Sequence, residues 1–336
     1  MRSRPAGRGG LGPGAIQLPS ATTLAATGIF NDSATLNASI NPGGLADAWF
    51  QYSTTANLSG PTVSTLAGST AGYLNGTGTG AKFSNPYGVA VDASGNVYVA
   101  DYNNNRIRKV TRLGVVTTLA GSTQGNLDGP GAGAQFNNPA GVAVDASGNV
   151  YVADMLNSRI RKVTSDGVVT TLAGSTDGFA NGTGTGAKFY YPTGVAVDAS
   201  GNVYVADIGN ARIRKVTALG VVTTFAGSSY GYLDGTGTAA QFAGPSGVAV
   251  DASGNVYVGD QYNRRVRKVT AEGVVTTLAG SGAYGSANGT GVEASFNGLF
   301  GVAVDASGNV YVADAGNALI RQVTAAGVVT TLYTCA

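Results

Sequence analysis

An acid, an amide and a base recur together along the chain at a fixed spacing. An Asp is followed three residues later by an Asn and two residues after that by an Arg. Such a set could bind a polar ligand, or it could hold a turn in which the carboxylate accepts hydrogen bonds from the guanidinium. Because every copy carries it, we interpret the set as structural. The complete sets are Asp101, Asn104, Arg106; Asp154, Asn157, Arg159; Asp207, Asn210, Arg212; and Asp260, Asn263, Arg265.

A fifth copy of this set departs from the others. Asp314 and Asn317 keep their places, but Leu319 stands where the Arg is expected, and Gln322 replaces a Lys. We therefore expect Asp314 to be less well paired than its four counterparts.

The residue types that are missing exclude several kinds of chemistry. The 336 residues include no His, and Cys335 is the one Cys. Ser-His-Asp triads, His-ligated metals and an internal disulfide are thereby excluded. The repeated DASGN turns, the first at Asp92, each offer one carboxylate, whereas calcium loops need several. We expect no metal and no cofactor, and a carboxylate site is the main catalytic option left.

The charge balance argues against nucleic acid as a partner. The formal net charge is +2, from 20 basic and 18 acidic residues, and Arg2, Arg4 and Arg8 lie in the opening tail. The rest is close to neutral, whereas a nucleic-acid binder shows a clustered basic footprint. No apolar run approaches the ~20 residues of a membrane helix, so we expect no membrane insertion.

The elements that position these residues come from a tandem repeat. GVAVDASGNVYV occurs five times, starting at Gly88, Gly141, Gly194, Gly247 and Gly301. Alternation and β-branched residues predict four strands in the first unit, at residues 88–92, 96–101, 106–111 and 115–120. Four antiparallel strands cannot bury both their faces alone, whereas copies stacked around an axis can. The repeat therefore predicts an all-β propeller.

The extended pattern PxGVAVDxxGNVYVADxxNxRIRKV resembles the NHL repeat over about residues 60–336. The resemblance implies a β-propeller of four-stranded antiparallel blades. The family includes sensor domains, RNA-binding adaptors and lyases, so the fold alone leaves function open.

The opening residues differ from the repeat. Residues 1–19 are rich in Arg, Gly and Pro, predict a disordered tail and do not resemble a signal peptide. Residues 20–60 resemble the first half of a bacterial fibronectin type III-like module, and residues 61–336 form the propeller. TVSTLAGST, starting at Thr62, matches the fourth strand of a unit. Because the family commonly closes with six blades, we predict six, with residues 20–68 supplying the sixth. The alternatives are a five-bladed ring, or strands that complete a neighbouring molecule and give a homo-oligomer.

Differences between the copies point to a binding face. The second-to-third and fourth-to-first connections of each blade share one face, and aromatic residues vary there. Exposed aromatics among small residues suit carbohydrate or protein ligands. The candidate ligand-binding residues are Tyr87, Tyr102, Tyr190, Tyr191, Tyr262 and Phe300.

These observations together favour a non-catalytic binding or interaction scaffold of bacterial type. The Cys-poor, Thr/Ser/Asn/Gly-rich composition suits an extracellular or cell-surface location. Two alternatives stay open. One is a structural subunit that assembles by exchanging N-terminal strands, and the other is a lactonase-like or lyase-like enzyme with a carboxylate site in the central channel.

Overall fold

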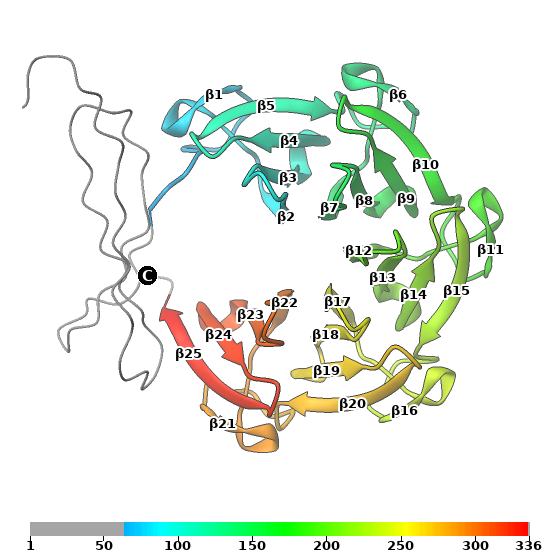
Figure 1. Cartoon of the computed structure of the whole chain (residues 1–336), viewed down its shortest axis with the longest axis vertical. Helices are drawn as coiled ribbons and strands as arrows, with labels where there is room; N and C mark the ends of the chain where they lie inside the picture. Colours follow the sequence, from blue (N-terminus) through cyan, green and yellow to red (C-terminus); the bar gives the residue numbers. More distant parts are fainter. Residues whose placement is uncertain (1–63, 335–336) are drawn as a thin grey trace, which may run out of the picture. The chain divides into compact units, whose positions relative to one another are not determined.

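The computed structural model describes residues 64–334, which form five twisted antiparallel sheets around one axis (Figure 1). We number these sheets blades 1 to 5 in chain order. Blade 1 contains β1 (Gly76–Thr77), β2 (Pro86–Val91), β3 (Val97–Asp101), β4 (Arg106–Val110) and β5 (Val115–Ala120). Blade 2 contains β6 (Gly129–Pro130), β7 (Pro139–Val144), β8 (Val150–Asp154), β9 (Arg159–Val163) and β10 (Val168–Gly174). Blade 3 contains β11 (Gly182–Thr183), β12 (Pro192–Val197), β13 (Val203–Asp207), β14 (Arg212–Val216) and β15 (Val221–Ala226).

The last two blades repeat the same plan. Blade 4 contains β16 (Gly235–Thr236), β17 (Pro245–Val250), β18 (Val256–Asp260), β19 (Arg265–Val269) and β20 (Val274–Ala279). Blade 5 contains β21 (Gly289–Thr290), β22 (Leu299–Val304), β23 (Val310–Asp314), β24 (Leu319–Val323) and β25 (Val328–Thr334). Short 3-10 helices lie in the connections: η1 (Gly78–Gly80), η2 (Tyr102–Asn104), η3 (Gly131–Gly133), η4 (Met155–Asn157), η5 (Gly184–Gly186), η6 (Ile208–Asn210), η7 (Gly237–Ala239), η8 (Gly291–Glu293) and η9 (Ala315–Asn317). No helix within residues 64–334 has the length and apolar character needed to cross a bilayer.

Each blade is ordered from the axis outward. In blade 1 the order is β2, β3, β4, β5 and then the two-residue β1. Figure 1 shows β2, β7, β12, β17 and β22 around the centre and β5, β10, β15, β20 and β25 farther out. The inner strands read Gly-Val-Ala-Val, and these small and β-branched side chains suit strands covered on both faces. The four predicted strands of the unit are confirmed to within two residues, whereas the fifth, short outer strand was not predicted.

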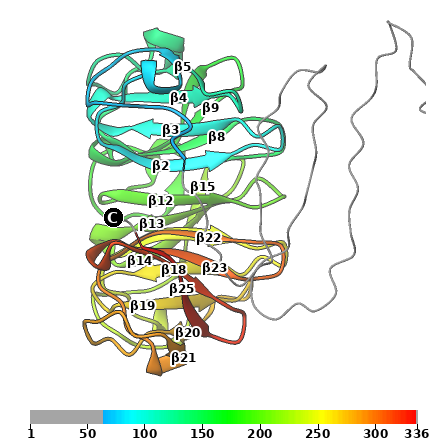
Figure 2. The same ribbon diagram turned by 90° about the vertical axis from the view of Figure 1, so that its left-hand side faces the viewer.

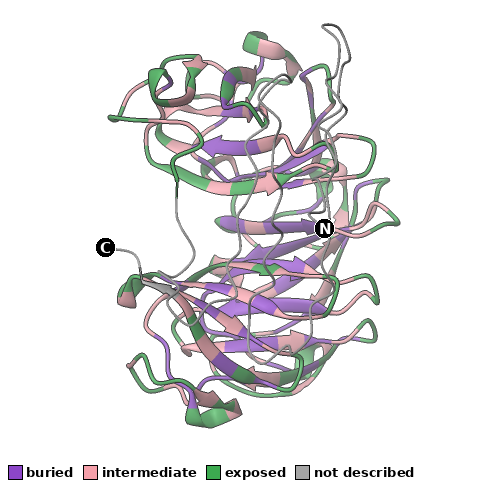
Figure 3. Ribbon diagram, turned by 60° about the vertical axis from the view of Figure 1, so that its left-hand side comes forward, coloured by how far each residue is buried: buried purple, intermediate pink, exposed green. Residues whose placement is uncertain are grey.

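The hydrophobic core lies between blades, as the purple strands in Figure 3 indicate. One face of blade 2, with Tyr151, Ala153 and Ile160, packs against Phe189 and Val203 of blade 3 in one cluster. Equivalent clusters join blades 1 and 2, 3 and 4, and 4 and 5. Each blade thus buries its apolar faces only against its neighbours, which is why one unit alone could not be stable.

The propeller is confirmed, but the prediction of six blades is not. The described residues form five, the number that we gave as the alternative. The segment predicted to supply a sixth, like the predicted tail and the fibronectin-like fragment, lies in residues 1–63, outside the described residues. The TVSTLAGST segment, which starts at Thr62 and matches the fourth strand of a unit in sequence, has no strand conformation in its described part, residues 64–70. Figures 1 and 2 show the ring open between blades 1 and 5, at β2 and β22.

Candidate ligand-binding site

The recurrent Asp at the end of each second strand is a structural centre. In blade 1, Asp101 Oδ1 accepts from the Ser84 backbone amide at 2.8 Å. Its Oδ2 accepts from Asn104 Nδ2 at 2.9 Å and from Arg108 Nη1 at 2.6 Å. The Asp101 and Arg108 side chains are both fully buried. A carboxylate that is fully buried and accepts three hydrogen bonds from its own blade is out of reach of a ligand in solvent, which agrees with the interpretation of this set as structural.

The Arg that pairs with this Asp is not the one that the spacing suggested. Arg108, two residues beyond Arg106, provides the guanidinium, while Arg106 Nη1 donates to the Asn104 carbonyl at 2.6 Å. Arg106 also lies over the Tyr73 ring, 3.8 Å from its centroid. The corresponding buried pairs are Arg161–Asp154, Arg214–Asp207, Arg267–Asp260 and Arg321–Asp314.

The expectation of weaker pairing in the fifth blade is therefore wrong. Arg321 Nη1 lies 2.9 Å from Asp314 Oδ2, and Asn317 Nδ2 donates to the same oxygen at 2.8 Å. Leu319 replaces the counterpart of Arg106, which takes no part in the pair. The substitution leaves the buried network intact.

The DASGN turns use their carboxylates internally. Asp92 Oδ1 accepts from the backbone amides of Ser94 and Asn96, and Oδ2 accepts from Asn96 Nδ2 and the Tyr98 hydroxyl. Within residues 64–334 no three His, Cys, Asp or Glu side chains gather as a metal site would require. These internal hydrogen bonds agree with a structural role for the Asp of the DASGN turn.

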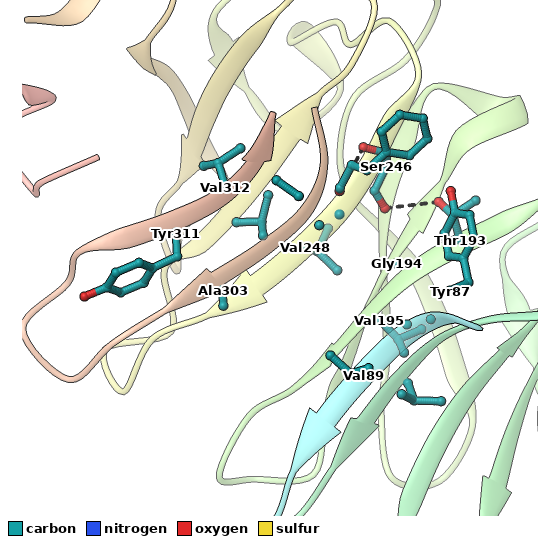
Figure 4. Close-up of a pocket in the computed structure, with 18 of the residues that line it drawn as sticks. Tyr87, Val89, Thr193, Gly194, Val195, Ser246, Val248, Ala303, Tyr311 and Val312 are labelled. Atoms are coloured by element: carbon teal, nitrogen blue, oxygen red, sulfur yellow. Dashed lines mark hydrogen bonds between the residues drawn. The ribbon is translucent and has the colours of Figure 1, made fainter. Parts of the chain in front are cut away.

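A cavity of about 510 Å³ occupies the central channel at the end nearest the variable loops (Figure 4). Its wall consists mainly of the inner-strand glycines and valines, among them Gly194, Val195 and Val248. The Thr and Ser hydroxyls on the wall are already engaged. Thr193 Oγ1 donates to the Ser246 carbonyl at 3.1 Å, and Ser246 Oγ donates to the Leu299 carbonyl at 2.8 Å. Of the described residues that line this cavity none is Asp or Glu, so the carboxylate enzyme alternative finds no acid here.

Two of the candidate aromatics line the cavity. Tyr87 of blade 1 and Phe300 of blade 5 meet edge to face across it, with ring centroids 6.4 Å apart. Both remain partly exposed, Tyr87 at 46% and Phe300 at 37%. Large apolar rings held exposed at the edge of an apolar cavity are available to a ligand.

Tyr102 and Tyr262 extend this aromatic group. The Tyr102 ring lies against Tyr87 with centroids 5.8 Å apart. Burial raises the pKa of the Tyr87 hydroxyl, and the nearby hydroxyls of Tyr102 and Tyr262 raise it further. The structure therefore brings together Tyr87, Tyr102, Tyr262 and Phe300, which we call the aromatic mouth.

Tyr190 and Tyr191 form a separate stack on blade 3. Their ring centroids lie 4.6 Å apart at an interplanar angle of 27°. Neither lines the cavity. Tyr191 has φ of 53°, a left-handed conformation that costs a bulky residue free energy, and Asn85 and Asn138 hold the equivalent places in blades 1 and 2. Gly209 makes room for the pair, because a Cβ there would lie 2.5 Å from the Tyr190 ring.

Sequence reasoning missed Tyr230, whose ring lies 6.3 Å from that of Tyr262. It sits in a long outer loop, 68% exposed. The equivalent position differs between blades, with Gln124 in blade 2, just as the positions of the other candidates do. Variation between the copies could therefore have identified Tyr230 from the sequence.

Comparison with known proteins agrees with this architecture. The model of the NHL repeat matches residues 83–110, 189–216 and 242–269, and that of the teneurin NHL domain matches residues 126–183. The NHL repeat model thus matches parts of three of the five blades. These matches support the NHL β-propeller family, and none of them covers residues 20–60, so the fibronectin-like resemblance is not supported.

Relatives of this chain are longer proteins. Protein SUPPRESSOR OF QUENCHING 1, chloroplastic, of Arabidopsis thaliana is 29% identical over 75% of this chain and 26% of its own length. NHL repeat-containing protein 2 of Gallus gallus is 26% identical over 78% of this chain and 42% of its own. The chain thus spans less than half of either relative.

Solved structures share the fold at low identity. An auxiliary nutrient binding protein from Bacteroides ovatus is 21% identical, with a TM-score of 0.56 over 74% of this chain and 60% of its own. Virginiamycin B lyase from Staphylococcus aureus is 14% identical, with a TM-score of 0.50 over 74% of this chain and 69% of its own. At these identities the likeness establishes the propeller fold and leaves activity undetermined.

Proposed function

We propose that this NHL propeller is a non-catalytic binding module that holds a protein or carbohydrate ligand at the aromatic mouth. The observation that carries the proposal is the contact of Tyr87 and Phe300 across the cavity, since the two rings come from the first and last described blades. Residues far apart in the sequence converge on one partly exposed aromatic surface. Aromatic anchors of this kind contribute a large share of binding energy at interfaces.

The chemistry of the cavity favours binding over catalysis. Its described lining residues are glycines, alanines, valines, aromatics, Pro86, Thr193, Ser246 and Ile320, without an acid, a Lys or an Arg. General acid–base catalysis near neutral pH needs a group that titrates there, and the titratable side chains on this wall are the tyrosines Tyr87 and Tyr311. These walls would instead make favourable apolar contacts with a flat ligand surface, such as one face of a pyranose ring or an aromatic or aliphatic side chain.

The location forms part of the proposal. The low Cys content and the small polar residues of the loops suit a secreted or surface-exposed module. Detection of the native protein in culture supernatant or by surface labelling of intact cells would support this location, and recovery only from the cell interior would contradict it.

A ligand screen tests the proposed site. The full chain is applied to a glycan array and to a phage-displayed peptide library, and each hit is measured by calorimetry. Tyr87→Ala and Phe300→Ala should each weaken a true ligand by roughly tenfold or more, the effect of removing an aromatic anchor. Tyr284→Ala is the matched control, because Tyr284 is exposed but does not line the cavity. Equal affinity for all four proteins would move the site elsewhere.

A further inference from the structure

One position at the outer edge of each blade alternates between Asn and Asp along the chain. It directly precedes the two-residue outermost strand, and its side chain accepts a hydrogen bond from Nη2 of the buried Arg of its blade. A Gly follows it in every blade. In chain order the residues are Asn75, Asp128, Asn181, Asp234 and Asn288. Blades 2 and 4 thus show what a carboxylate does at a place where blades 1, 3 and 5 carry an amide.

The carboxylate in blade 2 uses both of its oxygens. Asp128 Oδ1 accepts from Arg161 Nη2 at 2.6 Å and from Thr171 Oγ1 at 3.1 Å. Its Oδ2 accepts from the backbone amide of Thr171 at 3.0 Å. Asp234 of blade 4 makes the same three contacts. The two side chains are 46% and 44% exposed, so each carboxylate keeps part of its hydration while it pairs with a buried cation.

The amide in blades 1, 3 and 5 reproduces only part of this arrangement. Asn181 Oδ1 accepts from Arg214 Nη2 at 2.8 Å and from Thr224 Oγ1 at 3.4 Å, as the Asp oxygen does in blade 2. Asn75 and Asn288 make the same two contacts. The other terminal atom, Nδ2, therefore takes the place of the oxygen that accepts the Thr amide, and turning the side chain over would set it against the Arg and Thr donors. Within residues 64–334 no hydrogen bond links Nδ2 of these residues to a partner, and an N–H of the side chain faces the backbone N–H of the Thr.

The sequence at these three places favours loss of the amide. Asn is thermally labile, and the Gly that follows has no Cβ to hinder the approach of its nitrogen to the Asn side chain. The Gly nitrogen attacks Cγ, the bond from Cγ to Nδ2 breaks, and Nδ2 leaves as ammonia with the proton of the Gly amide. Water then opens the cyclic imide. Cleavage of the new bond at Cγ gives Asp, cleavage at the main-chain carbonyl gives isoaspartate, and neither route needs an oxidant or a reductant.

The fold leaves the three sites accessible and selects one product. Asn75, Asn181 and Asn288 are exposed, and the Gly after each lies in an outermost strand of only two residues. So short an edge strand opens at low free energy, which gives the Gly nitrogen access to Cγ. The isoaspartyl form does not fit when β11 re-forms, because it lengthens the main chain by one carbon and shortens the side chain that reaches Arg214. Since the two products interconvert through the imide, Asp accumulates.

We propose that Asn75, Asn181 and Asn288 are sites of spontaneous deamidation, at which the folded protein gains the Arg–Asp contact that blades 2 and 4 already have. Each conversion replaces a donor that faces a donor by an acceptor for the Thr amide, and it gives the buried Arg a negative partner. When all three are converted, the formal net charge falls from +2 to −1. None of the three lines the central cavity, so this inference is independent of the proposed ligand site.

Asn297 supplies a matched control within the same chain. It also precedes a Gly, but its Nδ2 donates to the Gly316 carbonyl at 3.1 Å, and the Gly316 amide donates back to the Asn297 carbonyl at 2.7 Å. Asp at this place would set an oxygen against a carbonyl. The full chain is kept in mildly alkaline buffer, and its peptides are followed by mass spectrometry. Conversion at the three proposed sites should be at least about tenfold faster than at Asn297, with Asp as the main product. Equal rates at all four residues, or mainly isoaspartate in the folded protein, would overturn the proposal.

Substitution tests whether Asp is the favoured residue at these sites. Asn181→Asp makes the product directly and should raise the thermal midpoint by about 2–4 °C, the shift expected for one gained hydrogen bond in a domain of this size. Asp128→Asn should lower the midpoint, because it gives blade 2 the arrangement of blade 3. Asn297→Asp should lower it as well. A midpoint that Asn181→Asp leaves unchanged or lowers would overturn the proposal.

The mass of the native protein separates this reaction from an enzymatic one. Each of the three sites reads Asn-Gly-Thr, which is also an acceptor sequence for N-linked glycosylation. Deamidation exchanges an amino group for a hydroxyl and hardly changes the mass, whereas a glycan adds the mass of its sugars to an Asn that keeps its nitrogen. Asp that accumulates with the age of the preparation would support the proposal, and glycans at these residues would overturn it.

Discussion

Arg214 Nη1 donates to Asp207 Oδ2 at 2.8 Å, and neither side chain is accessible to solvent. The guanidinium also donates from Nη2 to the Ala180 carbonyl and to Asn181 Oδ1, so it ties β14 to the loop before η5. Moving two charges out of water costs several kcal/mol per ion, and the dense hydrogen bonding offsets this cost. The pair serves to hold each outer loop in place against its own blade, and its recurrence in every blade keeps the five loops alike.

Removing one partner of this pair should be costly, whereas the neighbouring Arg should not matter much. Arg214→Met leaves a buried carboxylate without its cation, and we expect a loss of about 3–5 kcal/mol in the free energy of unfolding. Arg212→Met removes a half-buried Arg that stacks on Phe179 at 4.1 Å, and we expect at most about 1 kcal/mol. Urea denaturation followed by circular dichroism compares the two. Equal losses would mean that the buried pair has no special role.

The sequence predicts the Asp and the Asn of this network but not the correct Arg, and the register explains why. Arg106 stands directly opposite Asp101 in the ladder, as the spacing suggested. Arg108 reaches the carboxylate diagonally, because long side chains span to diagonal neighbours. Arg106 is diverted to Tyr73, a residue from a distant loop. That choice depends on tertiary contacts, which no local pattern specifies.

The inner-strand glycines should be intolerant of a methyl group. A Cβ on Gly194 would lie 2.3 Å from the Ser246 carbonyl of the next blade, so Gly194→Ala must push two blades apart. We expect a loss of roughly 1–3 kcal/mol, the usual cost of overpacking. Gly186→Ala is the control, since nothing lies within 4 Å of its Cβ position. Thermal unfolding of the two variants measures the difference, and an unchanged midpoint for Gly194→Ala would show that the blades can separate freely.

The second-strand tyrosines should titrate late and link stability to high pH. Burial raises the pKa of Tyr98, Tyr151, Tyr204 and Tyr257 to about 12, and the hydrogen bond and negative charge of a turn Asp contribute to each rise. Because the folded pKa lies above the unfolded value of 10.0, the folded state holds the protons more tightly. This contribution to stability is complete below pH 10 and is lost as the pH rises through about 12.

Absorbance at 295 nm during an alkaline titration measures this directly. Most of the 16 tyrosines should ionise first, and a separate late step should coincide with alkaline unfolding. Tyr98→Phe should reduce the late step by one tyrosine and leave the early step unchanged. A single transition near pH 10 in the folded protein would refute the prediction.

The aromatic mouth shows how far a sequence can locate a site. The positions of Tyr87 and Phe300 are visible because they vary between copies that are otherwise nearly identical. Their meeting across the cavity depends on how far the ring closes between blades 1 and 5. That geometry is set by the number of blades and by the opening between blades 1 and 5, and neither can be read from a single repeat. The sequence placed Tyr190 and Tyr191 in one zone with the residues of the mouth, because their separation also depends on this tertiary geometry.

The strained Tyr191 provides the last prediction, a double-mutant cycle. At φ of 53°, Asn is better accommodated than Tyr, so in a Tyr190→Ala background Tyr191→Asn should raise the free energy of unfolding by about 1 kcal/mol. In the wild-type background the gain should be smaller, because the substitution also removes the stacking contact, worth about 0.5–1.5 kcal/mol. Urea denaturation of the wild type, the two single variants and the double variant measures the change in the free energy of unfolding that Tyr191→Asn causes in each background. A destabilising Tyr191→Asn in the Tyr190→Ala background would mean that the backbone there is relaxed with Tyr in place. A stabilising one would show that the chain keeps a less stable residue at an exposed aromatic stack, which is the behaviour expected of a position retained for binding.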